Sequence, residues 1–290
     1  MEKKAIVLLG VLGVSFSAIF VKYTTAPPAV IALYRMFFAA AGLLPVVWIK
    51  CRDEIRQLEK RTVLMCFLSG IFLACHFTLY FQSLAYTSIA SSTVLVDTEV
   101  FFVAIISILF MKEKISRVGR ISILLTFAGS VILALGDRSA SSNAVYGDIL
   151  AVSGAFFVAL YTLIGRAERK KMTTTSYTFL VYAASSVTLA LYCLAAGIPV
   201  TGYGAKNYLL GMGLTLCCTF FGHSVFSWSL KYLSPSFVST AKLGEPVFAT
   251  ILGIILFRQM PAQQQVVGGV IILAGLYLYT CCENRKGASI

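Results

Sequence analysis

Two stretches of the chain, SLAYTSIASSTVLVDTE at residues 83–99 and SLKYLSPSFVSTAKLGE at residues 229–245, share the spacing of a serine, a leucine, a tyrosine and a final glutamate. They are part of a gapless repeat with an offset of 146 residues, which aligns 61–132 with 207–278. Apolar matches are common by chance in an apolar chain, but a glutamate matched inside an apolar run is costly and therefore informative. The repeat indicates that one structural unit occurs twice.

The composition excludes an ordinary water-soluble domain. Of 290 residues, 58% are apolar and 12% are charged, and the mean hydropathy is +0.85, whereas soluble domains carry about a quarter charged residues. The net charge of +12 does not indicate nucleic-acid binding, because the lysines and arginines lie mainly in short segments between apolar runs. There they are expected to meet lipid headgroups. The lipid bilayer is therefore the expected partner, and no nucleic acid is expected.

Ten apolar runs of a length suited to crossing a bilayer, about 20 residues, follow one another along the chain. They predict an all-α integral membrane protein with ten transmembrane helices. The predicted spans are 5–22, 28–48, 63–84, 89–111, 119–136, 147–165, 175–196, 208–230, 235–257 and 264–281.

The distribution of positive charge predicts the orientation. If the N-terminus is cytoplasmic, the inside segments hold 18 lysines and arginines and the outside segments hold 4. The positive-inside rule then favours both termini in the cytoplasm and an even number of spans. We expect a multi-pass protein of a bacterial plasma membrane.

The repeat and the span count together predict an inverted arrangement. The offset divides the ten spans into two units of five, residues 1–136 and 147–282. Because five is odd, the second unit enters the membrane from the opposite side, and a pseudo-twofold axis in the membrane plane relates the two. Two similar gates around one central site are suited to alternating access.

Several motifs resemble the EamA-type members of the drug/metabolite transporter superfamily. They are ALYR at 32–35, GDIL from residue 147, LGEPVF at 243–248 and GGVIILAG at 268–275. The resemblance implies two five-helix bundles that transport small organic solutes such as amino acids or amines, with no cofactor and no bound metal. One departure is Val100, which stands where the second repeat has Pro246 after the intramembrane glutamate.

Charged and aromatic residues inside predicted spans are candidates for the substrate pathway, because a charge in the bilayer centre must face protein or water. They could line a cavity for a charged or zwitterionic solute, or they could form internal ion pairs that hold the two halves together; the sequence leaves both open. The candidates are Arg35, Phe72, His76, Tyr80, Glu99, Tyr161, Lys242 and Glu245.

Helical spacing gives expectations for the acidic residues. Asp97 and Glu99 are two residues apart, about 200° around an α-helix, so we expect them to face apart and not to line one narrow cavity. Glu99 has no basic residue three or four positions away, which makes it the candidate for proton uptake and proton coupling. The alternative is that Glu99 pairs across helices, for example with Arg35.

In the ninth predicted span, Lys242 and Glu245 are three residues apart, so a salt bridge between them is the simplest expectation. Pro246 has no amide hydrogen to donate to the Lys242 carbonyl and is expected to kink this helix.

The function that these features favour is transport of a small organic metabolite, with export as the expected direction. An intramembrane enzyme, or a membrane receptor or scaffold, is the alternative. We find no HExxH or GxSxG motif that would favour catalysis, and no catalytic residue is predicted. Oligomeric state and substrate identity are not indicated by the sequence.

Overall fold

The computed structural model describes residues 3–87, 89–112, 115–135, 144–257 and 263–287. Over these residues the chain forms α-helices and one π-helix and no β-strand, which confirms the all-α class. The elements are α1 (Lys3–Ser15), α2 (Ser17–Lys22), α3 (Pro28–Lys50), α4 (Arg52–Gln57), α5 (Lys60–Ser83), α6 (Ile89–Val96), α7 (Glu99–Met111), α8 (Arg117–Leu135), α9 (Ala144–Glu168), α10 (Thr174–Ala195), α11 (Ala205–Gly213), η1 (Leu214–His223), α12 (Ser224–Ser229), α13 (Pro235–Lys242), α14 (Glu245–Phe257) and α15 (Gln263–Gly287).

Seven helical stretches of the described chain are long and apolar enough to cross a membrane. A shorter apolar helix runs from Val266 to Tyr279. The seven are Lys3–Lys22, Pro28–Lys50, Lys60–Ser83, Ser92–Phe110, Val145–Glu168, Thr174–Ala195 and Ala205–Ser229.

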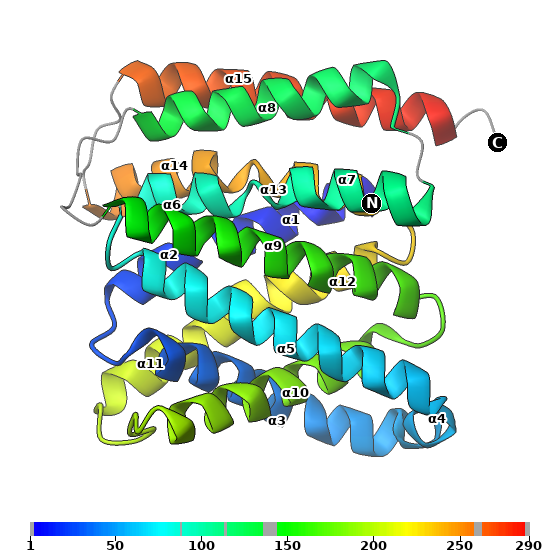
Figure 1. Cartoon of the computed structure of the whole chain (residues 1–290), viewed down its shortest axis with the longest axis vertical. Coiled ribbons are helices and arrows are strands. Elements are labelled where there is room, and N and C mark those ends of the chain that lie inside the picture. Colours follow the sequence, from blue (N-terminus) through cyan, green and yellow to red (C-terminus); the bar gives the residue numbers. More distant parts are fainter. Residues whose placement is uncertain (1–2, 88, 113–114, 136–143, 258–262, 288–290) are drawn as a thin grey trace.

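The long helices lie side by side in layers (Figure 1). Helices α3 and α10 pack together at one end of the molecule, and α8 and α15 form a pair at the other end. Between these ends, α5 packs on α9, and α1 packs on η1. The start of α1, the end of α15 and the short helix α4 all lie at the right-hand side of Figure 1. Helices α6, α7, α13 and α14 lie next to one another, in the layer below the α8–α15 pair in Figure 1.

The apolar and charged side chains are distributed as expected for a protein that spans a membrane. Large apolar side chains point outward, and Ile49, Phe110 and Leu194 are each more than three-quarters exposed. Charged side chains of the same helices lie inside, because Arg35 and Glu99 are 1% and 2% exposed. Lipid can solvate the apolar side chains but not the charged ones, so these buried charges need protein groups or water around them.

One contact outside the membrane-spanning stretches joins the two halves of the chain. The Glu54 carboxylate in α4 accepts hydrogen bonds from the backbone N–H and the hydroxyl of Thr173, both at 2.6 Å, and from the hydroxyl of Ser176. Thr173 is also the N-cap of α10. Burial raises the pKa of Glu54, but the hydrogen bonds from Ser176 and Thr173 outweigh it and leave the pKa below its usual value. The ionised carboxylate therefore fastens α4 to the start of α10.

We expect Glu54→Gln to lower the melting temperature of the purified protein at neutral pH and to have a smaller effect at acidic pH. Since the pKa is lowered in the folded state, the stabilisation is present above the ordinary value of 4.5 and is lost as pH falls through the folded value. Melting curves of both proteins across this range measure it. Asp53→Asn, an exposed position in the same helix, is the control and should show no such trend. An equal difference at every pH would contradict the assignment.

A buried charged cavity between two interrupted helices

Two membrane-spanning helices are interrupted where they meet. Helix α6 ends before Asp97, and α7 begins at Glu99; α13 ends at Lys242, and α14 begins at Glu245. At each interruption the backbone tightens into turns with a three-residue spacing, such as the Leu243 N–H donating to the Thr240 carbonyl at 3.1 Å. Helix α7 contacts α13, and α6 contacts α14. The two interruptions are therefore neighbours in space.

The proline of the second repeat does not explain both interruptions. In the ninth predicted span the break lies directly before Pro246, but the matching break occurs although the corresponding residue is Val100. Both breaks place a glutamate in the first position of a new half-helix, where the partial positive charge of the helix N-terminus favours a carboxylate. Glu99 and Glu245 thus occupy equivalent electrostatic positions in the two repeats.

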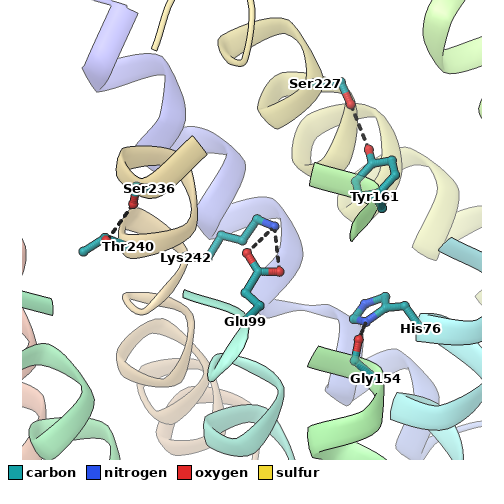
Figure 2. Close-up of polar contacts among 8 residues, drawn as sticks. All are labelled: His76, Glu99, Gly154, Tyr161, Ser227, Ser236, Thr240 and Lys242. Carbon is teal, nitrogen blue, oxygen red and sulfur yellow. Dashed lines mark hydrogen bonds and ion pairs between the residues drawn. The ribbon is translucent and has the colours of Figure 1, made fainter. Parts of the chain in front are cut away.

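Lys242 pairs with only one of these two carboxylates, that of Glu99. The Lys242 Nζ lies 2.8 Å and 3.2 Å from the two carboxylate oxygens of Glu99 (Figure 2). Both side chains are less than one-tenth exposed. The residue 146 positions before Lys242 is Val96, so this cation has no counterpart in the first repeat. The pair joins the end of α13 to the start of α7, and hence one repeat to the other.

This geometry corrects two expectations. The expected Lys242–Glu245 salt bridge is wrong, because Lys242 reaches across to Glu99 instead. Glu99 is also not an unpaired carboxylate, so the premise that made it the candidate for proton uptake fails. The alternative that Glu99 pairs across helices is the one observed, although its partner is Lys242 and not Arg35. Distances along one helix could not reveal a partner 143 residues away.

Arg35 of α3 is held from three sides. Its Nε donates to the Thr219 hydroxyl at 2.8 Å, and its Nη1 lies 3.4 Å from the Ser17 hydroxyl. The guanidinium carbon stands 4.1 Å from the centre of the Phe77 ring, where a cation is stabilised by the ring face. Its Nη2 is buried without a hydrogen-bond partner. The side chain is thus fixed in orientation but not fully satisfied.

The π-helix η1 brings a second histidine to the first. Sequence alignment matches His76 with Gly222, one position before His223. A π-helix, with hydrogen bonds to the fifth residue back, takes in about one more residue per turn than an α-helix, which shifts the side chains that follow. The rings of His76 and His223 accordingly lie 6.3 Å apart, while the His76 Nδ1 is 3.1 Å from the Gly154 carbonyl (Figure 2).

These groups surround a cavity of about 40 Å³. A single water needs at least about 10–15 Å³ of such space, so the cavity has room for a few waters and not for a metabolite. Its lining is Val14, Ser17, Arg35, His76, Phe77, Tyr80, Thr93, Val96, Asp97, Glu99, Val158, His223, Phe226, Lys242 and Glu245.

Six of the eight residues predicted for the pathway border this cavity. The two that do not are Phe72 and Tyr161. The Phe72 ring lies against Phe157, and the buried Tyr161 hydroxyl is 2.8 Å from the Ser227 hydroxyl (Figure 2). Tyr161 still approaches the cavity wall, because its ring centre is 6.0 Å from that of His223.

Asp97 borders the same cavity as Glu99, so the expectation that they could not share one is wrong. That expectation treated 89–111 as one continuous helix, whereas the helix stops at Val96 and restarts at Glu99. Projection by a constant angle per residue does not hold across such an interruption. Asp97 is 3% exposed, and its Oδ2 has no hydrogen-bond partner.

Sequence reasoning passed over His223 and the residues that hold Arg35. The repeat alignment places His223 one position after the match of His76, and the π-helix removes this difference. A histidine inside a predicted span is itself a sufficient signal, and His223 could have been found from it. Thr219 and Phe77 carry no such signal, because a threonine or a phenylalanine in an apolar span is ordinary.

Helices interrupted in equivalent positions of two repeats, around a buried charged site, are typical of membrane carriers. The chain belongs to the EamA-like transporter family, which matches residues 4–135 and again residues 145–281. It is therefore a multi-pass membrane transporter of this family.

Known relatives and a solved structure agree with this assignment. An uncharacterized transporter of Archaeoglobus fulgidus is 25% identical over 263 residues, covering 89% of each chain. The pseudopaline exporter CntI of Pseudomonas aeruginosa strain UCBPP-PA14 is 23% identical over 263 residues, covering 91% of this chain and 89% of the relative. A crystal structure superposes with a TM-score of 0.78 at 18% identity and covers 98% of both chains, which shows a shared fold.

Breaking the Lys242–Glu99 pair from one side should destabilise the protein more than removing both charges. Glu99→Gln or Lys242→Met alone leaves a charge with no counter-charge bonded to it, which costs about 3–5 kcal/mol. The double variant should lose less than the sum of the two single losses. Melting temperatures of the four purified proteins measure this coupling.

The Glu168–Lys171 pair provides the control, because its distance is 3.0 Å but the lysine is 48% exposed. Coupling there should be smaller, because water screens the half-exposed lysine although the Glu168 carboxylate is buried. Strictly additive losses for Glu99 and Lys242 would contradict a stabilising pair.

Proposed function

We propose that this transporter carries a small polar organic metabolite, such as an amino acid or an amine, out of the cytoplasm by alternating access between two inverted five-helix repeats. The proposal includes ten spans, of which 1–136 and 147–282 hold five each. The single observation that carries it is the charged cavity at the junction of the two interrupted helices. A site at that junction can open to either side without being rebuilt.

The contacts between helices support the inverted arrangement. Helix α5 packs on α9, and its repeat mate η1 packs on α1. Helix α6 contacts α14, while α7 contacts α13. Each of these contacts thus has an equivalent contact when the two repeats are exchanged by a twofold rotation. Matches of one family to both 4–135 and 145–281 support a duplicated unit with boundaries close to those proposed.

A polar cavity favours a polar solute. The lining carries three carboxylates, one guanidinium and one ammonium, and burying these groups is costly unless they bind something or pair. The relative named as a pseudopaline exporter supports export as the direction. A bacterial plasma membrane with both termini in the cytoplasm is the location that the charge distribution favours.

The proposal includes proton coupling, but Glu99 is no longer the candidate for the residue that binds the proton. Because Glu99 is bonded to Lys242, the better candidates are Asp97 and Glu245, for which the structure gives no ion pair. Both border the cavity, so substrate and proton would meet in one place.

The topology has a direct test. We expect alkaline phosphatase, which is active only outside the cytoplasm, to be inactive when fused after Ile290, and green fluorescent protein fused at the same place to fluoresce. Phosphatase fused in the segment 197–204 should be active. An active, intact fusion after Ile290 would contradict ten spans with both termini inside.

Transport itself is tested with purified protein in liposomes. Vesicles preloaded with an unlabelled mixture of the twenty amino acids and common diamines should accumulate at least one labelled member of that mixture by exchange, whereas protein-free vesicles should not. A proton gradient should drive net flux in the natural protein and lose this effect in Glu245→Gln or Asp97→Asn. Binding without any exchange would instead favour a receptor, and chemical conversion of a solute would favour an intramembrane enzyme.

A further inference from the structure

Two buried side chains of opposite charge remain incompletely bonded in the cavity. Once Lys242 and Glu99 have paired, Arg35 and Asp97 each keep a side-chain atom, Nη2 and Oδ2, that is buried without a hydrogen-bond partner. Their residues are 1% and 3% exposed. Most buried polar groups in proteins are satisfied, and each exception costs stability. Both exceptions border the same cavity, so one ligand could satisfy them together.

The Arg35 end suits a carboxylate. Bonds to Thr219 and Ser17 hold Nε and Nη1, and the Phe77 ring covers one face of the guanidinium. The contacts leave Nη2 as the free donor. A guanidinium fixed in this way recognises a carboxylate by charge and by directed hydrogen bonds.

The Asp97 end suits an ammonium. Asp97 directly follows α6, and its N–H donates to the Thr93 carbonyl at 2.9 Å. The end of a half-helix carries partial negative charge on its carbonyls, which favours a cation beside the carboxylate. Glu245 borders the same space and adds negative charge there. Lys242 donates hydrogen bonds to Glu99 and not to Asp97.

We propose that the cavity is a two-point site for a solute that carries both a carboxylate and an ammonium group, with Arg35 binding the carboxylate and Asp97 binding the ammonium. This assignment rests on the proposed function and deepens it, because it names the substrate class and the residue for each end. At about 40 Å³ the cavity must widen when the solute enters. The solute would bind between the side chains of Arg35 and Asp97, and the cavity would widen there.

The experiment compares residue changes with matching changes in the ligand. Each of the twenty amino acids is added to the purified full chain, and binding is measured by thermal stabilisation and calorimetry. The best binder is then compared with its carboxamide, which lacks the carboxylate, and with its N-acetyl form, which lacks the ammonium. In the natural protein each derivative should bind about tenfold to a hundredfold more weakly, the loss expected for one charged hydrogen bond.

The variants should remove these preferences selectively. In Asp97→Asn, the amino acid and its N-acetyl form should bind equally, while the carboxamide stays weaker. In Arg35→Gln, the amino acid and its carboxamide should bind equally, while the N-acetyl form stays weaker. Arg35→Lys keeps the charge and should retain part of the preference for the carboxylate. Glu168→Gln, a buried carboxylate outside the cavity, should keep both preferences.

Several outcomes would overturn the two-point site. These are the absence of binding by all twenty amino acids, equal binding of the derivatives by the natural protein, and preferences that neither substitution changes. The ligand series on the natural protein decides the question even if Arg35→Gln does not fold. Failure of the transport proposal looks different, since selective binding would persist without exchange across vesicles. Exchange that is insensitive to both residues would instead reject the site and leave transport standing.

Discussion

The constraint that organises this protein is the cost of placing charge inside a bilayer. Arg35, Asp97, Glu99 and Lys242 lie in membrane-spanning stretches whose outer faces are apolar, and each is less than one-tenth exposed. The bundle must therefore close around them, and the Lys242–Glu99 pair shows how it does so. One partner comes from each repeat, and each stands at the end of a half-helix. The same contact neutralises two charges and locks the two halves together.

Interrupted helices make this arrangement possible. A continuous helix satisfies its own backbone and offers only side chains to the interior, whereas an interruption also presents carbonyls and N–H groups at membrane depth. Here both interruptions lie against each other, so the polar backbone is enclosed by protein. The π-helix η1 acts in a related way, because its Thr219 holds Arg35 and its His223 faces His76. Irregular backbone is thus concentrated around one small space.

The all-α membrane class and the repeated unit could be predicted because they follow from long-range patterns. Span lengths, hydropathy and the 146-residue offset average over many residues, so local irregularities do not disturb them. The site was predictable as a set of residues, since an intramembrane charge must face inward, but not as a set of pairs. Asp97 was placed wrongly because its helix was taken as continuous. His223 was missed because the repeat alignment leaves it one position from the match of His76, whereas η1 is a π-helix. Lys242 was paired with Glu245 because the sequence gives the spacing of residues along one helix but not their distances to residues on other helices.

The missing counterpart of Lys242 affects more than local pairing. If the two repeats were identical, the inward-facing and outward-facing states of the carrier would be related by the twofold axis and would have equal free energy. A single lysine that bonds Glu99, with Val96 at the equivalent place, removes that equality. A bias of about 1.4 kcal/mol already shifts such an equilibrium tenfold. In the proposed alternating-access cycle, the cavity of the empty protein would then face mainly one side of the membrane.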